Sequence, residues 1–68
     1  MLVLTAKLDN VLVALDEGIP NGTKIARNYI GMGEEIYKAG FIIGVALSDI
    51  REGEVLNSKN LGSRYVGF

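Results

Sequence analysis

The chain has 68 residues, enough for one domain and too few for a second. It contains no Cys and no His, which excludes disulfides, thiolate metal sites and the most common general base. Seven Lys and Arg against eight Asp and Glu give a formal net charge of −1, which argues against non-specific nucleic-acid binding.

Two apolar runs in the first quarter of the chain predict short strands. Residues 2–4 and 11–15 are aliphatic, and turn-forming residues at 7–10 separate them. The second run is apolar on both faces, which predicts burial on both sides or one face covered by a partner. The Asp-Glu-Gly sequence at 16–18 then predicts a loop.

A heptad that occurs three times organises the rest of the chain. It begins and ends with an aliphatic residue, has Gly at its fourth position and Thr or Glu at its fifth, and covers residues 19–25, 30–36 and 50–56. Pro20 suits the second position of a type I turn and Gly22 the fourth, so each heptad predicts a tight turn that leads into a short strand. Three copies in so short a chain favour a structural repeat over chance.

The middle of the chain predicts one helical turn followed by the clearest strand. Residues 26–29 can form a single turn of helix, which the glycines of the second heptad stop. Ala39-Gly40 is a turn signal. Residues 41–47 predict a strand, and Gly44 within it predicts a bulge or a close approach of another backbone.

The last third of the chain resembles the first. The aliphatic and Gly positions of the first heptad recur 31 positions later in the third, and residues 13–15 match residues 45–47 one position out of step. Residues 57–61 predict a second helical turn, Gly62-Ser63 a hinge, and residues 64–68 a terminal strand or tail. The duplication predicts pseudo-twofold packing of two similar halves. The fold class that follows is all-β and barrel-like or clip-like, with a compact α+β fold as the alternative.

The small size of the chain has a further consequence. A domain of this length buries only about 60% of the surface that its unfolded form exposes, so stability from the core alone is marginal. Without disulfides, association with a partner or another copy is the remaining source of stability. No apolar run is long enough to span a bilayer, and Lys7 and Asp9 end the apolar start too early for a signal sequence. We expect one soluble, cytoplasmic domain over residues 1–68.

The ordered series of these residues resembles the N-terminal SAF-type domain of the altronate/galactarate dehydratase family. In sulfolactate sulfo-lyase and in some split dehydratases the same small domain is a separate subunit. After an Asp-Asn-Val sequence at 9–11, the matching positions fall in register: Ile19, Pro20, Gly22, Lys24, Ala26, Ile30, Gly33, Glu34, Lys38, Gly40, Ile43, Gly44, Asp49, Ile50, Gly53, Glu54 and Asn60. The resemblance implies a β-clip fold, as in antifreeze-like domains.

Four positions depart from the family pattern. Where the family has His, this chain has Thr23, Val55, Asn57 and Lys59. The segment that normally precedes Ile19 in the family also looks deleted. In the family those His are candidates for metal or substrate contact. Val55 can do neither, whereas Asn57 and Lys59 can still hydrogen-bond an acid but are poor metal ligands. The resemblance therefore implies that this chain shares the family's fold, but not that it keeps the family's catalytic residues.

The residues predicted to contact a sugar acid are polar and lie in or beside the heptads. They are Asp9, Asn10, Thr23, Lys24, Glu54, Asn57, Lys59 and Asn60. Each has a structural alternative, because Glu can close a turn and face water, Asp and Asn form Asx turns, and Lys is often solvated. No nucleophile–base pair and no metal triad is recognisable, so catalytic residues stay unassigned and this chain alone is predicted to bind no cofactor or metal.

Two functions remain open at this point. The first is a small accessory subunit of a sugar-acid dehydratase that caps the active site of a separate large catalytic subunit, with any divalent iron or magnesium held by that partner. The second is a non-catalytic β-clip binding or assembly module that has lost the family's histidines. A homo-oligomer is compatible with both, and neither nucleic acid nor membrane is an expected partner.

Overall fold

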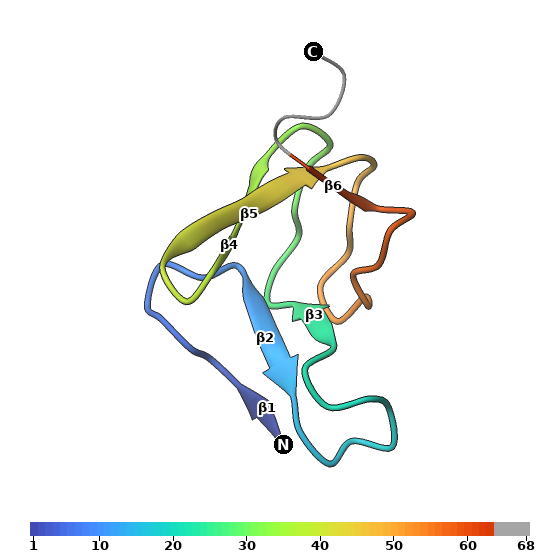
Figure 1. Cartoon of the computed structure of the whole chain (residues 1–68). Coiled ribbons are helices and arrows are strands. Elements are labelled where there is room, and N and C mark those ends of the chain that lie inside the picture. Colours follow the sequence, from blue (N-terminus) through green and yellow to red (C-terminus); the bar gives the residue numbers. More distant parts are fainter. Residues whose placement is uncertain (64–68) are drawn as a thin grey trace.

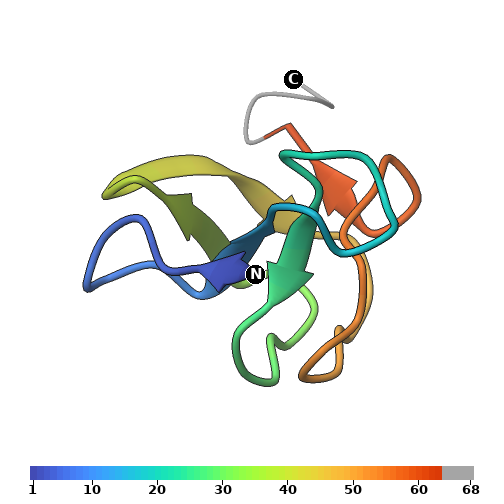
Figure 2. The ribbon, with the colours of Figure 1, turned by 90° about the horizontal axis from the view of Figure 1, so that it is seen from below.

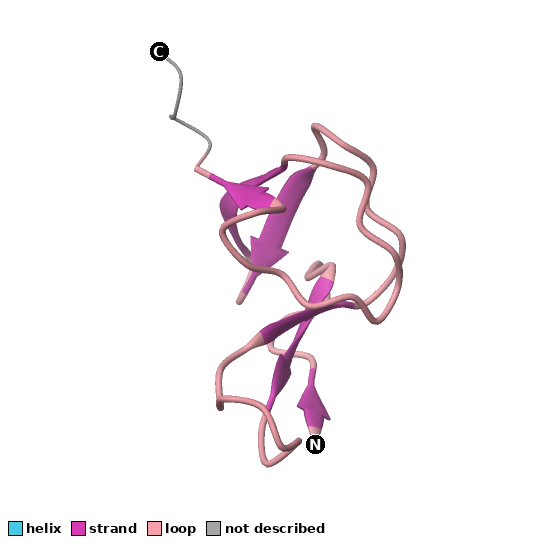
Figure 3. Cartoon of the chain, turned by 90° about the vertical axis from the view of Figure 1, so that its right-hand side faces the viewer, coloured by secondary structure: helices cyan, strands magenta, loops and turns pink. Residues whose placement is uncertain are grey.

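In a computed structural model, which describes residues 1–63, the chain forms two three-stranded antiparallel sheets (Figure 1). The first sheet has the order β1-β2-β3, from Leu2–Val3, Val11–Ala14 and Lys24–Ala26. The second has the order β4-β5-β6, from Glu35–Lys38, Phe41–Ala46 and Leu61–Gly62. Figure 3 shows the two sheets as separate groups of strands joined by loops. The predicted all-β class is confirmed, and the arrangement fits a small β-clip.

Each heptad forms the same tight turn. The N–H of its fifth residue donates to the carbonyl of its second: Thr23 to Pro20 at 3.1 Å, Glu34 to Gly31 at 3.0 Å, and Glu54 to Arg51 at 3.0 Å. The fourth-position glycines have φ of 92°, 88° and 84°. A positive φ at the third residue of the turn is the type II pattern, which glycine adopts without strain. The prediction for this turn was therefore wrong in two respects. The turn begins at Pro20 rather than Ile19, and it is of type II rather than type I.

A buried alanine pairs with each of these turns. The Gly N–H donates to an alanine carbonyl, and the alanine N–H donates back to the carbonyl of the fifth residue, all at 2.8–2.9 Å. Ala14 pairs with the first heptad, Ala46 with the second and Ala26 with the third, and none is more than 2% exposed. The sequence repeat at 13–15 and 45–47 indicates the first two alanines. Ala26 lacks that context and was missed.

The pseudo-twofold packing of two similar halves stays a prediction, although each of the two sheets has three strands. Their central strands, β2 and β5, end at the equivalent alanines Ala14 and Ala46. The edge strands pair on the other side of them, Leu2 with Ala14 and Leu61 with Ala46. The chain order differs, because the heptad paired with Ala14 follows β2 whereas the heptad paired with Ala46 precedes β5.

The two predicted helical turns are corrected by the structure. Residues 1–63 contain no helix, and hence none long and apolar enough to cross a membrane. Ala26 ends β3, and the N–H of Arg27 donates to the Asn10 carbonyl at 2.9 Å, so cross-strand partners replace a local turn over residues 26–29. Residues 57–61 make one hydrogen-bonded turn that is too short for a helix.

The C-terminal predictions have mixed outcomes. Gly62 is not a hinge, because it belongs to β6 and pairs with Val45. The prediction of a terminal strand or tail at residues 64–68 lies outside the described residues.

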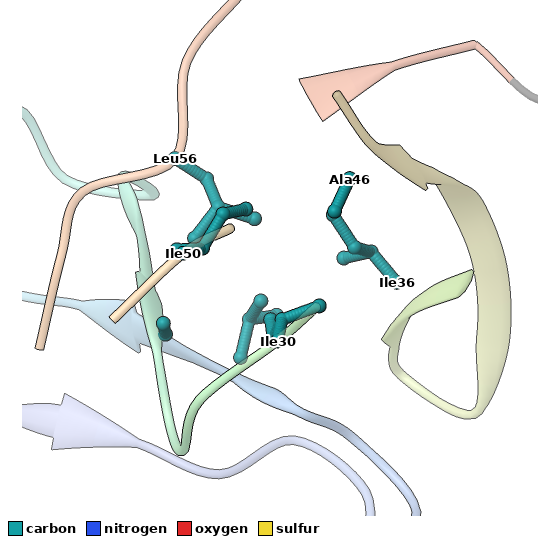
Figure 4. Packing of buried hydrophobic residues seen from close by; sticks show 7 residues of the cluster. Ile30, Ile36, Ala46, Ile50 and Leu56 are labelled. Carbon is teal, nitrogen blue, oxygen red and sulfur yellow. The ribbon is translucent and has the colours of Figure 1, made fainter. Parts of the chain in front are cut away.

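The hydrophobic core combines both sheets and the heptads (Figure 4). Its buried members are Val11, Ala26, Ile30, Ile36, Ala46, Ile50 and Leu56. Ile30 and Ile50 exchange two backbone hydrogen bonds of 2.8 Å, which joins the second heptad to the third. The aliphatic ends of these two heptads therefore anchor their turns to the core as predicted. Ile19 does not, since it is exposed.

The hairpin of β4 and β5 ends in a two-residue turn at the predicted Ala39-Gly40 position. Both residues have positive φ, 54° and 81°, which is the type I′ pattern. Further along the hairpin, Ile36 faces Gly44 while Tyr37 faces Ile42, so the register shifts by one residue beside Gly44. The predicted bulge is confirmed.

Replacing Ala39 with Asn is expected to stabilise the protein. Alanine in the left-handed region costs about 1 kcal/mol, whereas Asn-Gly is the preferred sequence of a type I′ turn. The melting temperature should rise by about 5 °C, measured by circular dichroism. Ala39→Val is the matched control, because a β-branched residue fits this φ worse than alanine and should lower the melting temperature. An unchanged or lower value for the Asn variant would contradict the turn assignment.

Candidate functional site

One face of the first sheet points away from the core. Side chains alternate between the two faces of a strand. Val11 and Ala26 face each other across β2 and β3 and belong to the core cluster, so their neighbours Leu12 and Ile25 point the other way. Ile25 is only 8% exposed, yet it lies outside the core cluster. We call the side of this sheet that carries Leu12 and Ile25 the outer face.

The third heptad extends the outer face beyond β3. Ile25 forms an antiparallel bridge with Val55, and the Leu56 N–H donates to the Lys24 carbonyl at 2.8 Å. Extending this register by two residues past the bridge sets Thr23 opposite Asn57, and alternation then puts both on the same face as Ile25 and Val55. Leu56 points into the core, as alternation requires. Three of the positions at which the sequence departs from the family pattern, 23, 55 and 57, thus meet on one face.

The outer face has an aliphatic floor with polar groups along one side. Leu12, Ile25 and Val55 lie side by side across the strands, and Val55 is 38% exposed. The Thr23 hydroxyl donates to the Pro20 carbonyl at 2.6 Å and keeps its lone pairs as acceptors. The exposed Asn57 accepts the Lys59 N–H at 2.8 Å through Oδ1. Its amide NH2 group supplies two donors of the kind that bind hydroxyl or carboxylate oxygens.

Asn60 supports this arrangement from the inside. It is only 6% exposed, and its Nδ2 donates to the Val55 carbonyl at 3.0 Å while its Oδ1 accepts the Asn57 N–H at 2.8 Å. Glu54 accepts the Arg51 N–H at 3.1 Å across its own turn. Alternation places Lys24 and Glu54 away from the outer face, whereas Lys59 is exposed in the turn that follows Asn57.

Asp9 and Asn10 lie at a different place, the junction between the first sheet and the β4–β5 hairpin. The Asp9 carboxylate, 1% exposed, accepts the Ala39 N–H at 2.8 Å and the Gly40 N–H at 2.9 Å. Asn10 donates to the Glu35 carbonyl at 2.9 Å and accepts the Tyr37 N–H at 2.8 Å. Of the eight predicted residues, Thr23 and Asn57 therefore lie together on the outer face and Asp9 and Asn10 at this junction, whereas Lys24, Glu54, Lys59 and Asn60 belong to neither group.

The electrostatics of Asp9 follow from its partners. Burial raises the pKa of the carboxyl group, and the hydrogen bonds from the Thr5 hydroxyl and the N–H groups of Gly40 and Ala39 lower it. The hydrogen bonds outweigh burial, so the pKa of Asp9 lies below its ordinary value of 3.8. Asp9 is therefore an ionised group that holds the hairpin turn.

A polar contact that was not predicted lies beside the second heptad. Desolvation together with the hydrogen bond to Asp49 raises the pKa of the Tyr29 hydroxyl, and the negative charge of Glu34 adds to this. Asp49 also accepts the Met32 N–H at 2.9 Å. Asp49 directly precedes the third heptad, so it ties the turn of the second heptad to the start of the third. The only sequence signal was the acidic residue before Ile50.

The residues at the departing positions do not fit a divalent metal. Val55 has no ligand atom, Lys59 carries an ammonium group, and the oxygens of Thr23 and Asn57 take part in local hydrogen bonds. Across residues 1–63, no group of three or more His, Cys, Asp or Glu side chains is placed to hold a metal, and no pocket is present.

Comparison with known proteins identifies a family. Residues 3–64 match the family model described as the altronate/galactarate dehydratase SAF domain, and no curated protein matches the chain. The matched range includes all three heptads, strands β2 to β6 and the outer face. The chain belongs to the altronate/galactarate dehydratase SAF domain family.

Proposed function

We propose that this chain is a small accessory subunit of a sugar-acid dehydratase and that its outer face caps the active site of a separate large polypeptide. The observation that carries the proposal is the convergence of Thr23, Val55 and Asn57 on the outer face of a domain that belongs to the dehydratase family. In the family pattern these positions hold the residues expected to meet substrate or metal.

The chain's own contribution would be to bind and to exclude water. Thr23 and Asn57 would hydrogen-bond the hydroxyl or carboxylate oxygens of an acid, and the Lys59 ammonium would attract its negative charge. Leu12 and Val55 would cover the substrate with an apolar surface. Removing water from a hydroxy acid needs a base at the carbon beside the carboxylate and a Lewis acid at the leaving hydroxyl. Both, together with any divalent iron or magnesium, would come from the large polypeptide.

The exposure of the outer face supports a second polypeptide. Asn57 is exposed and Val55 is 38% exposed, so an acid lying on them would still face water on its other side. Small-molecule sites usually bury most of the ligand surface between concave walls. A larger subunit would supply the missing wall.

A non-catalytic binding or assembly module is the second candidate. One observation favours it. At position 55, where the family pattern has a His that could bind a ligand, this chain has the aliphatic Val55 on the outer face. In that case the outer face would pack against another protein without meeting a sugar acid.

Gentle purification of the tagged chain from its own host separates the two candidates. A large polypeptide recovered in stoichiometric amount, with hydro-lyase activity toward altronate or galactarate, is the expected result for an accessory subunit. Recovery of the chain alone or as a small homo-oligomer would rule out the dehydratase proposal and leave the binding module.

Changing Asn57 to Asp is expected to weaken binding of a sugar acid about 10-fold, because the new carboxylate repels the acid's own. The acceptor oxygen for the Lys59 N–H is kept, so the fold should be unchanged. Calorimetric titration of the purified complex with galactarate measures the change. Asn28→Asp, an equal charge change at an exposed residue away from the outer face, should leave the affinity unaltered. Equal weakening in both variants would place the binding site elsewhere.

A further inference from the structure

Two turns lie side by side at one end of the molecule, as Figure 2 shows for the β1–β2 loop and the β4–β5 turn. The Asp9 N–H donates to the Ala6 carbonyl at 3.0 Å and closes the turn of residues 6–9. The Asp9 carboxylate then bonds the N–H groups of Ala39 and Gly40 in the hairpin turn. We call residues 5–9 and 38–41 together the double-turn tip.

The double-turn tip carries the most exposed large hydrophobic side chains of the described residues. Leu8 and Phe41 are each 74% exposed, one from either turn. Two apolar side chains held out in water at this exposure, on turns that Asp9 joins by hydrogen bonds, mark a surface that another molecule covers. Aromatic side chains are also the residues most enriched among the energetic anchors of protein interfaces.

The buried Asp9 carboxylate holds the tip in one conformation. The Asp9 carboxylate is almost fully buried there, and the Thr5 hydroxyl donates to it at 2.5 Å. Ala39 is kept at a φ of 54°, which is strained for alanine. The hydrogen bonds that its N–H donates to Asp9 and Thr5 compensate this strain. A surface ordered before binding loses little conformational entropy on association, so a small number of anchors suffices.

The charges around the two anchors have one sign. Lys38 faces Phe41 across the hairpin, so their side chains share a face, and Lys7 directly precedes Leu8. The tip's one carboxylate, Asp9, is buried beneath the turns. The exposed tip is therefore two apolar side chains flanked by two ammonium groups.

We propose that the double-turn tip is a docking surface for another protein, and that it inserts Leu8 and Phe41 into an apolar pocket bordered by carboxylates. Within the proposed function this partner is the large dehydratase polypeptide, and the inference rests on that proposal only for the partner's identity. A protein pocket, rather than an anionic membrane, fits a chain whose net charge is −1 and whose tip has a fixed shape.

Site-specific photo-crosslinking in the native host tests the docking surface. Photoreactive benzoylphenylalanine is placed at Phe41 and, as the matched control, at Met32, which is 69% exposed in the turn of the second heptad. Irradiation should join position 41 to one polypeptide, at a peptide with apolar residues beside Asp or Glu, at least 10-fold more than position 32. Adding Lys7→Glu and Lys38→Glu should reduce that product at least 10-fold while thermal melting stays unchanged. If the double variant does not melt cooperatively, Lys7→Glu alone is compared.

The outcomes separate the docking surface from the proposed function. Cross-linking to a dehydratase polypeptide supports both, and cross-linking to an unrelated protein at an acid-bordered apolar peptide supports the docking surface while the dehydratase proposal fails. Equal products at positions 41 and 32, products with lipid or with a second copy of the chain, or insensitivity to the lysine changes would overturn the docking surface. If a dehydratase polypeptide nevertheless co-purifies, the proposed function stands without it.

Discussion

Gly44→Ala is expected to destabilise the protein by about 3 kcal/mol or more and to lower the melting temperature by about 15 °C. A Cβ at this position would come closer to the Gly62 carbonyl oxygen than real Cβ atoms come to any neighbour, and it would lie 2.8 Å from Cδ1 of Leu61. The oxygen belongs to the β6 backbone, which pairs with β5 and cannot move without breaking the sheet. A small domain has little stability to lose, so the folded fraction should fall visibly at 37 °C.

Gly31→Ala is the matched control for this prediction. Its φ is also outside the positive region, and a Cβ there would meet Oε1 of the Glu34 side chain at 3.2 Å, which can rotate away. Its melting temperature should stay within about 3 °C of the unmodified protein. Both variants are compared by circular dichroism melts at pH 7. Equal stability of the two would show that β5 and β6 do not approach as closely as described.

The local features of the fold were predictable because they depend on neighbouring residues. The strand at β5, the turn at Ala39-Gly40 and the bulge at Gly44 follow from apolar runs and from glycine placement. The heptads predicted a tight turn in each copy, one residue too early. Their type was wrong, because the backbone angle at the fourth-position glycine is decided by pairing with a distant alanine carbonyl.

The failed predictions share one physical cause. A helical turn at residues 26–29 is compatible with local propensity, but the N–H groups of Ala26 and Arg27 find carbonyls of Glu54 and Asn10 far away in the chain. In a chain with few local hydrogen bonds, such long-range pairing decides the backbone.

The candidate site was predictable in part for the same reason. Departure from the family pattern singled out Thr23 and Asn57, and only the bridge between Ile25 and Val55 shows that they share a face. The position of Asp9 beneath the hairpin turn has no sequence signal, because the turn it holds lies 30 residues further along the chain. Its sequence neighbours predict an ordinary Asx turn instead.

Asp9→Asn is expected to lower the melting temperature by about 10 °C at pH 7. The carboxylate accepts two N–H groups, from Ala39 at Oδ2 and from Gly40 at Oδ1. An asparagine of the same shape has one acceptor oxygen, and its NH2 group would face the second donor. Asn21→Asp, a change of the same two residue types in reverse at an exposed turn position, should cost less than about 3 °C. Equal melting temperatures for Asp9→Asn and the unmodified protein would mean that the carboxylate does not hold the hairpin.

The same variant gives Asp9 a signature in acid. Burial raises the pKa of Asp9, but hydrogen bonds from Thr5, Gly40 and Ala39 lower it by more than burial raises it. The folded pKa therefore lies below the unfolded value of 3.8. The unfolded chain therefore binds a proton more readily, and the stabilisation from Asp9 is complete above about pH 5 and is lost as the pH falls through 3.8 toward the folded pKa. Melting temperatures of both proteins between pH 7 and pH 2.5 should consequently approach one another as the pH falls below 3.8, with the widest gap at pH 7. Parallel curves across this range would show that another carboxylate carries the acid sensitivity and that Asp9 is not the ionised support of the hairpin turn.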